Sequence, residues 1–195
     1  MTRTRLAAVL GVVAVLAVVA TGAIAVATRD GDEPGRAGSV VVTDPESGAS
    51  FQVPGMGWRL RAADSRISYG PVHVDGPALL DEGYCKAQPK GSFRALAGFT
   101  DQSFDAWVSG VMGGAPTVST GTSAEDVVLA DGTPATFRWT GLLGPEGPCA
   151  ASGIEVAMIR AGDVRAVVVA DSGDAGTLSP EKVPEILLTL SLDTR

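Results

Sequence analysis

The chain has 195 residues and carries 15 Lys and Arg against 22 Asp and Glu, a formal net charge of −7. That length allows one domain with an appendage. Because a nucleic-acid-binding protein needs a basic face to displace the counterions of the phosphates, this balance excludes nucleic acid as a partner. The single histidine, His73, leaves little room for a zinc or haem site, and we expect no cofactor and no metal.

The first element along the chain is an uncharged apolar run at residues 6–27. As a helix it would measure about 33 Å, enough to cross a hydrocarbon core of roughly 30 Å. The apolar region of a signal peptide is usually shorter, so we expect a retained transmembrane anchor. Ala23-Ile24-Ala25 and Ala25-Val26-Ala27 both fit a small-residue cleavage pattern, and secretion after cleavage is the alternative.

Residues 1–5 then form a cytoplasmic tail, with Arg3 and Arg5 on the positive-inside side of the membrane. Residues 28–38 contain no bulky apolar side chain, and we expect a flexible stalk there. Residues 39–195 are long enough to bury a core of their own. Because the two cysteines suit an oxidising compartment, we place residues 28–195 outside the cytoplasm, attached to the cell membrane.

Most of the domain at residues 39–195 has the pattern of β-strands. Short β-branched or alternating runs predict strands at residues 39–43, 51–54, 58–61, 93–99, 126–130, 135–140, 152–160 and 164–170. Asp131-Gly132 and the stretch at residues 161–163 predict two hairpins, and consecutive hairpins give antiparallel pairing. We also expect the strands at residues 51–54 and 58–61 to pair with each other. The strand at residues 164–170 is apolar on both faces apart from Arg165, which favours a central position.

Two stretches change to helical periodicity. At residues 101–112 the apolar residues Phe104, Trp107, Val108 and Val111 fall on one helical face. Near the C-terminus, Ser179 followed by Pro180 predicts a helix start, and Val183, Ile186, Leu187 and Leu190 form its apolar stripe. The sequence therefore predicts an α+β domain in which two helices pack on an antiparallel sheet of five or more strands.

Several short motifs resemble those of uncharacterised exported or membrane-anchored proteins of high-GC Gram-positive bacteria. The motifs lie at residues 43–54, Trp58, residues 83–85, residues 148–149, residues 167–171 and residues 186–190. The opening, in which Asp44-Pro45 is followed by Phe51, Val53-Pro54 and Trp58, is also similar to PsbP-like sandwich domains. This resemblance implies an α+β binding module rather than an enzyme, and it assigns no activity or site residue.

The two cysteines of the chain are Cys85 and Cys149. Their separation excludes a CxxC redox motif, and the exported side of a membrane is oxidising. We therefore expect a structural disulfide between them. By the chain-entropy argument, closing so long a loop contributes on the order of 4 kcal/mol.

Two groups of polar residues are candidates for chemistry. His73 with Asp75 has the composition of a general base and its orienting carboxylate, but no Gly-x-Ser-x-Gly turn supplies a nucleophile. Asp171 and Asp174 among glycines have oxygen ligands suited to Ca²⁺, but they lack EF-hand spacing and equally suit a turn.

Function is predicted from these residues as binding rather than catalysis. Trp58 follows Gly55-Met56-Gly57 and is the best candidate for an exposed tryptophan, so Trp58, His73 and Asp75 form the predicted binding surface. We expect a non-catalytic interaction module of the cell envelope, with a protein, a lipid or a cell-wall component as partner. The alternative is an envelope hydrolase with its active site near His73.

Overall fold

The computed structural model describes residues 38–81, 93–111, 118–143, 153–171 and 182–192. The chain divides into two compact units, Met1–Asp32 and Glu33–Arg195, and every described residue lies in the second. Several predictions fall outside the described residues: the tail, the membrane span and the stalk up to residue 37, the Cys85–Cys149 disulfide, Asp174, and the Ser179 helix cap. Within the described ranges, no helix is long and apolar enough to cross a membrane.

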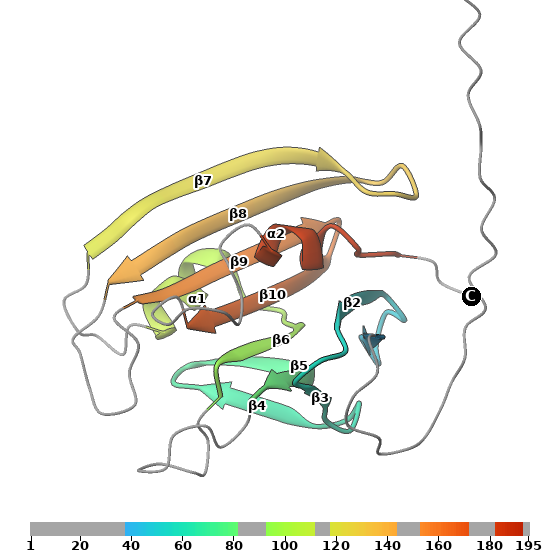
Figure 1. The fold of residues 1–195 in the computed structure, drawn as a ribbon. Helices are drawn as coiled ribbons and strands as arrows, with labels where there is room; N and C mark the ends of the chain where they lie inside the picture. Colours follow the sequence, from blue (N-terminus) through green and yellow to red (C-terminus); the bar gives the residue numbers. More distant parts are fainter. Residues whose placement is uncertain (1–37, 82–92, 112–117, 144–152, 172–181, 193–195) are drawn as a thin grey trace, which may run out of the picture. The chain divides into compact units, whose positions relative to one another are not determined.

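The described residues form ten strands and two helices. In chain order these are β1 (Ser39–Thr43), β2 (Ser50–Pro54), β3 (Trp58–Leu60), β4 (Arg66–Tyr69), β5 (Val72–Leu80), β6 (Ala95–Phe99), α1 (Phe104–Val111), β7 (Val118–Val128), β8 (Pro134–Leu143), β9 (Gly153–Ala161), β10 (Val164–Asp171) and α2 (Lys182–Leu187). Figure 1 shows their arrangement. The predicted α+β class, with a mostly antiparallel sheet and few helices, is confirmed.

The main sheet has the strand order β3-β5-β6-β10-β9-β8-β7, with β4 paired to β5, and all its pairs are antiparallel. Both predicted hairpins are present, as β7–β8 and β9–β10. Gly132 and Gly162 occupy their turns at φ +86° and +60°, a backbone region that glycine enters without strain. The predicted central strand is β10, which lies in the middle of the order.

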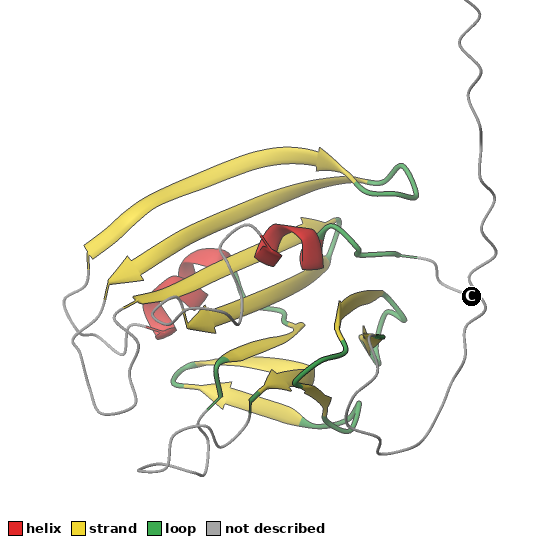
Figure 2. Ribbon diagram, viewed as in Figure 1, coloured by secondary structure: helices red, strands yellow, loops and turns green. Residues whose placement is uncertain are grey.

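The sheet separates two apolar cores, because successive side chains of a strand point to opposite faces. On β10, Ala166 and Val168 belong to the core beneath α2, whereas Val167 and Val169 belong to the core beneath α1. The two helices thus cover opposite faces of one sheet (Figure 2). A strand that is buried on both faces needs apolar residues at every position, which is the pattern of this segment.

Helix α1 begins and packs as its sequence predicts. The Ser103 hydroxyl accepts a hydrogen bond from the Ala106 backbone N–H at 3.2 Å, which caps the first turn. Phe104, Trp107 and Val111 are buried, and Val108 is half-buried against the same core. Near the C-terminus, the predicted stripe is buried in the other core, but α2 ends at Leu187, so only Val183, Ile186 and Leu187 lie on the helix and Leu190 follows it.

One predicted pairing is wrong. The strands on either side of Gly55–Gly57 do not pair with each other: β2 pairs with β1, and β3 pairs with β5. The Gly55 N–H donates to the Gly38 carbonyl at 2.5 Å, which extends the β1–β2 ladder by one bond. The chain then leaves this two-stranded ribbon and enters the main sheet at Trp58, so the glycine turn connects two sheets instead of closing a hairpin.

The side chains of β5 exchange faces of the sheet partway along the strand. Val72 and Val74 pack in the α1 core, whereas Ala78 and Leu80 pack in the α2 core. The pairing register with β6 shifts between Asp75 and Ala78, and this bulge turns the strand over. As a result, His73 and Asp75 lie on the same side of the sheet as Leu80 but near the opposite end of the strand.

Candidate functional site

The predicted surface of Trp58, His73 and Asp75 does not exist as expected. Trp58 is 5% exposed and belongs to the core beneath α2, so the expectation that it is exposed is wrong. It pairs with Leu80, whereas His73 pairs with Ser68 near the other end of β5. Several residues of extended strand, at roughly 3.3 Å each, separate the two positions. Trp58 is therefore a core residue that lies apart from His73.

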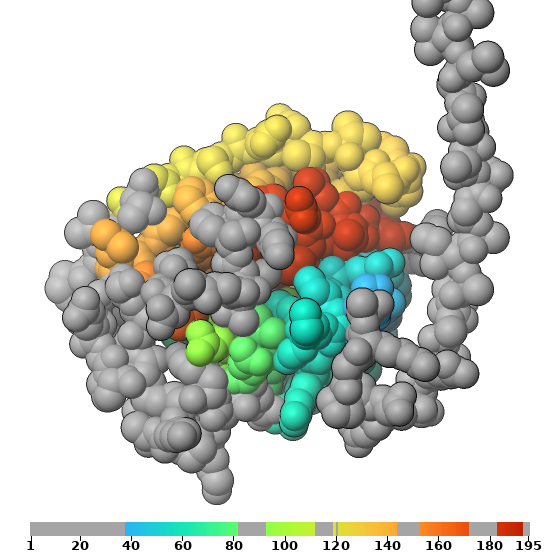
Figure 3. All heavy atoms as spheres, viewed as in Figure 1, coloured from blue at the N-terminus to red at the C-terminus, as the bar shows by residue number. Residues whose placement is uncertain are grey.

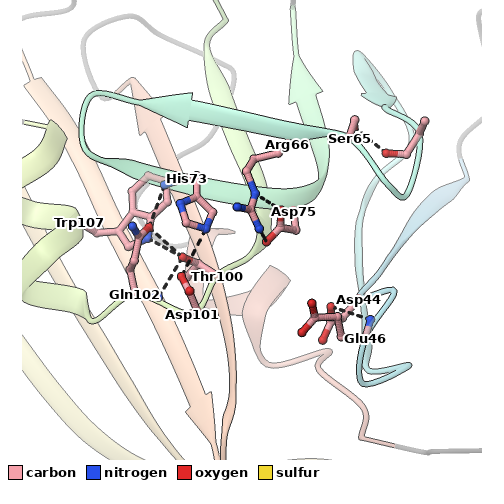
Figure 4. A network of polar contacts seen from close by, with 11 residues as sticks. Asp44, Glu46, Ser65, Arg66, His73, Asp75, Thr100, Asp101, Gln102 and Trp107 are labelled. Carbon is pink, nitrogen blue, oxygen red and sulfur yellow. Dashed lines mark hydrogen bonds and ion pairs between the residues drawn. The ribbon is translucent and has the colours of Figure 1, made fainter.

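His73 lies in a network that links β5 to the start of α1 (Figure 4). The Gln102 side-chain oxygen accepts a hydrogen bond from the His73 backbone N–H at 2.8 Å, and its nitrogen donates to the Pro71 carbonyl at 3.2 Å. The buried indole N–H of Trp107 donates to the Thr100 hydroxyl at 3.1 Å. These bonds satisfy polar groups at a loop and a helix start, which is a structural role.

The carboxylate beside the His73 ring is Asp101, not Asp75. His73 Nε2 is buried 3.3 Å from Asp101 Oδ1, with a geometry that falls short of a hydrogen bond. Asp75 instead accepts two bonds from the Arg66 guanidinium, at 2.6 and 3.1 Å. Asp75 therefore does not orient the His73 ring, and the candidate general-base pair is not formed. Among the described residues, the His73 ring lies beside the carboxylate of Asp101, and the His73 backbone N–H donates to Gln102.

A groove lies near the opposite edge of the main sheet from this network. It runs between the β7–β8 hairpin and α2. Its volume is about 400 Å³. Seven residues line it: Ser123, Glu125, Val127, Phe137, Trp139, Pro184 and Leu188. In Figure 3 the atoms of β7 (yellow) and β8 (gold to orange) lie beside those of α2 (red). Pockets that hold small molecules usually measure about 300–1,000 Å³, so the groove has the size of a ligand site.

The register of the strands explains why Trp139 faces open space. Ser123 on β7 and Ala157 on β9 lie directly opposite Trp139. Both side chains are small, so neither covers the indole, and Trp139 is half-buried while neighbouring Phe137 is buried. On the α2 side, Leu188 is 40% exposed and lines the same groove. An aromatic floor and an aliphatic wall thus meet at a solvent-accessible position.

A buried carboxyl group contacts one residue of the groove, Trp139. Glu155 on β9 is 5% exposed, and its Oε2 accepts a bond from the Trp139 indole N–H at 3.5 Å. Burial raises the pKa of Glu155, and the indole hydrogen bond opposes that rise. The second acid of the groove, Glu125, is exposed on β7. The groove therefore combines apolar contact area with the exposed carboxylate of Glu125, and the buried Glu155 contacts its Trp139.

Positive charge on the same strands lies on the opposite face. Arg138 makes bonds of 3.0 and 3.3 Å to Asp105 of α1, and its guanidinium lies 4.4 Å from the centre of the Phe104 ring. Arg160 is two residues after Met158 on β9 and so shares its face of the sheet, and Met158 packs in the α1 core. These are the arginines of β7, β8 and β9, so the groove face of these three strands has acidic groups and no basic ones.

The sequence contained one signal for this groove. Phe137 and Trp139 are two residues apart in the predicted strand at residues 135–140, so they share one face, and two aromatic residues on one strand face are typical of a core. A half-buried Trp139 requires the small residues opposite it and a helix that stops short of covering it. Both depend on strand register and helix position, which the sequence pattern alone did not determine.

The fold and the groove define an α+β domain that carries a pocket of ligand size on one face of its sheet. Residues 32–194 match the domain of unknown function DUF8017, and the chain belongs to that family. This agrees with the expectation of an uncharacterised family. No curated protein matches the sequence.

One solved structure that is similar to this chain is the solution structure of cyanobacterial PsbP (CyanoP) from Synechocystis sp. PCC 6803. The two chains share 11% sequence identity, the match covers 84% of this chain and 98% of that chain, and the TM-score is 0.45.

Proposed function

We propose that residues 33–195 form a non-catalytic domain that binds a small apolar or amphipathic molecule in the groove between β7–β8 and α2. The observation that supports this most is the half-buried Trp139 beside the exposed Leu188, in a groove of about 400 Å³. Exposed aromatic and aliphatic groups that converge in a concavity are the usual lining of a ligand site. This groove replaces Trp58, His73 and Asp75 as the proposed binding surface.

The proposed setting is the cell envelope, with the apolar run at residues 6–27 as a membrane anchor and residues 28–195 outside the cytoplasm. A domain held next to a lipid bilayer meets amphipathic molecules at high local concentration. The lipid or cell-wall component named as a partner on sequence grounds fits this location. Secretion of the domain after cleavage near Ala25 or Ala27 remains the alternative for localisation.

The experiment uses the full-length chain and the neutral probe N-phenyl-1-naphthylamine, whose fluorescence rises in an apolar site. Saturable fluorescence enhancement is the expected result. Leu188→Ser should weaken it, because Leu188 lines the groove, and Leu60→Ser is the matched control. Leu60 is 51% exposed on β3, outside the groove, so the two substitutions remove similar surface. Equal binding by the two variants would contradict the groove as the site.

A further inference from the structure

Trp139 lies between two carboxyl groups on the groove face. Glu125 pairs with Phe137, two residues before Trp139 on β8, and Glu155 pairs with Gly141, two residues after it. Each acid is therefore a diagonal neighbour of the indole, at a distance of about 7–8 Å between residues. Glu125 lines the groove, and Glu155 contacts the Trp139 indole N–H from the buried side.

This arrangement attracts a cation for two independent reasons. The exposed carboxylate of Glu125 lowers the electrostatic potential in the groove, and the arginines of β8 and β9 lie on the face of the sheet that α1 covers. The ring face of a tryptophan also attracts a cation through its quadrupole, more strongly than the other aromatic side chains do. An anion at the same place would meet Glu125 without a basic partner from β7, β8 or β9.

The apolar residues of the groove favour a ligand that also has an apolar group. Pro184 of α2, Leu188 directly after that helix, and Val127 of β7 also line the groove. A metal ion or a small hydrated cation would leave these surfaces in water, whereas an alkyl or aryl group would cover them. The groove volume of about 400 Å³ accommodates a molecule that has both parts.

We propose that this groove is specific for an organic cation, with an ammonium group against Trp139 and Glu125 and an apolar group against Leu188. This inference rests on the proposed function, and it adds the chemical class of the ligand. It also assigns a role to Glu155. This residue accepts a hydrogen bond from the indole N–H at the edge of the ring, and the ring face stays free for the cation.

The test is isothermal titration of the full-length chain with three probes of one chain length: hexyltrimethylammonium, 1-hexanol and hexanesulfonate. The cation should bind most tightly and the sulfonate least. Glu125→Gln should lower the affinity for the cation by about two- to fivefold, as expected for an exposed charge pair, and leave the affinity for hexanol unchanged. Asp126→Asn is the matched control, because Asp126 is the next residue on β7 and bonds Thr136 on the other face.

Each outcome is decisive. A cation preference that falls in the Glu125 variant and persists in the Asp126 variant supports the inference. Equal binding of the three probes, lost in Leu188→Ser, would overturn the cation specificity and leave the proposed function standing. Tighter binding of the sulfonate would also overturn it. Binding of none of the probes, or binding that Leu188→Ser does not change, would overturn the proposed function and the inference together.

Discussion

Replacing Trp58 by alanine should destabilise the domain strongly, although Trp58 has the sequence context of an exposed binding residue. The side chain is 5% exposed in the core that β3 shares with α2. A tryptophan buries about 200 Å², and at about 25 cal/mol per Å² its burial is worth roughly 5 kcal/mol. That value is an upper estimate and agrees with the roughly 3–5 kcal/mol measured for such truncations.

Urea and thermal unfolding of the full-length chain measure this effect. For a domain of this size, about 2–4 °C of melting temperature accompanies each kcal/mol, so Trp58→Ala should lower Tm by about 6–20 °C. Leu60→Ala is the control on the same strand, because Leu60 is 51% exposed and its truncation should cost less than about 1 kcal/mol. Equal Tm values for the two variants would refute the placement of Trp58 in the core.

Three further predictions concern residues around the two cores. Thr100→Val removes the acceptor of the buried Trp107 indole N–H and should cost about 1–3 kcal/mol; an unchanged urea midpoint would contradict that role. Gly110→Ala places a methyl group 2.9 Å from Val72 and should cost roughly 1–3 kcal/mol, measured in the same way, whereas a stabilised variant would show that α1 lies farther from β5. Burial raises the pKa of Glu155 above its ordinary 4.5, so the unfolded chain ionises first and the domain loses stability as the pH rises above that value. Glu155→Gln should therefore be more stable than the natural chain at pH 7.5 and similar to it near pH 4, and a pH-independent difference would contradict the assignment.

Local signals in the sequence were sufficient for much of the fold. The hairpin at Asp131-Gly132 was predictable because the glycine turn lies between alternating runs, and β7 and β8 pair across it. The central position of β10 followed from apolar residues on both faces. Helix α1 was predictable because Phe104, Trp107 and Val111 repeat with helical spacing.

Non-local contacts were not predictable in the same way. The three-residue strand at Trp58 is too short for its alternation to indicate which face is buried, and its partner, β5, comes much later in the chain. The β4–β5 hairpin was missed although residues 66–69 and 72–75 both alternate, because the alternation is short and breaks at Gly76-Pro77. The groove required α2 to lie beside Trp139 and the register to place Ser123 and Ala157 opposite it.

The central claim, that the groove at Trp139 is a ligand site, can be tested through the three tryptophan indole N–H signals of the full-length chain. Trp58 and Trp107 are buried in separate cores, whereas Trp139 lines the groove, so each signal reports a different place. Two-dimensional NMR during titration with hexyltrimethylammonium should shift the Trp139 indole signal saturably and leave the other two in place. Trp139→Phe identifies that signal by its loss. A titration that moves none of the three signals, or that moves those of Trp58 and Trp107 equally, would contradict the claim.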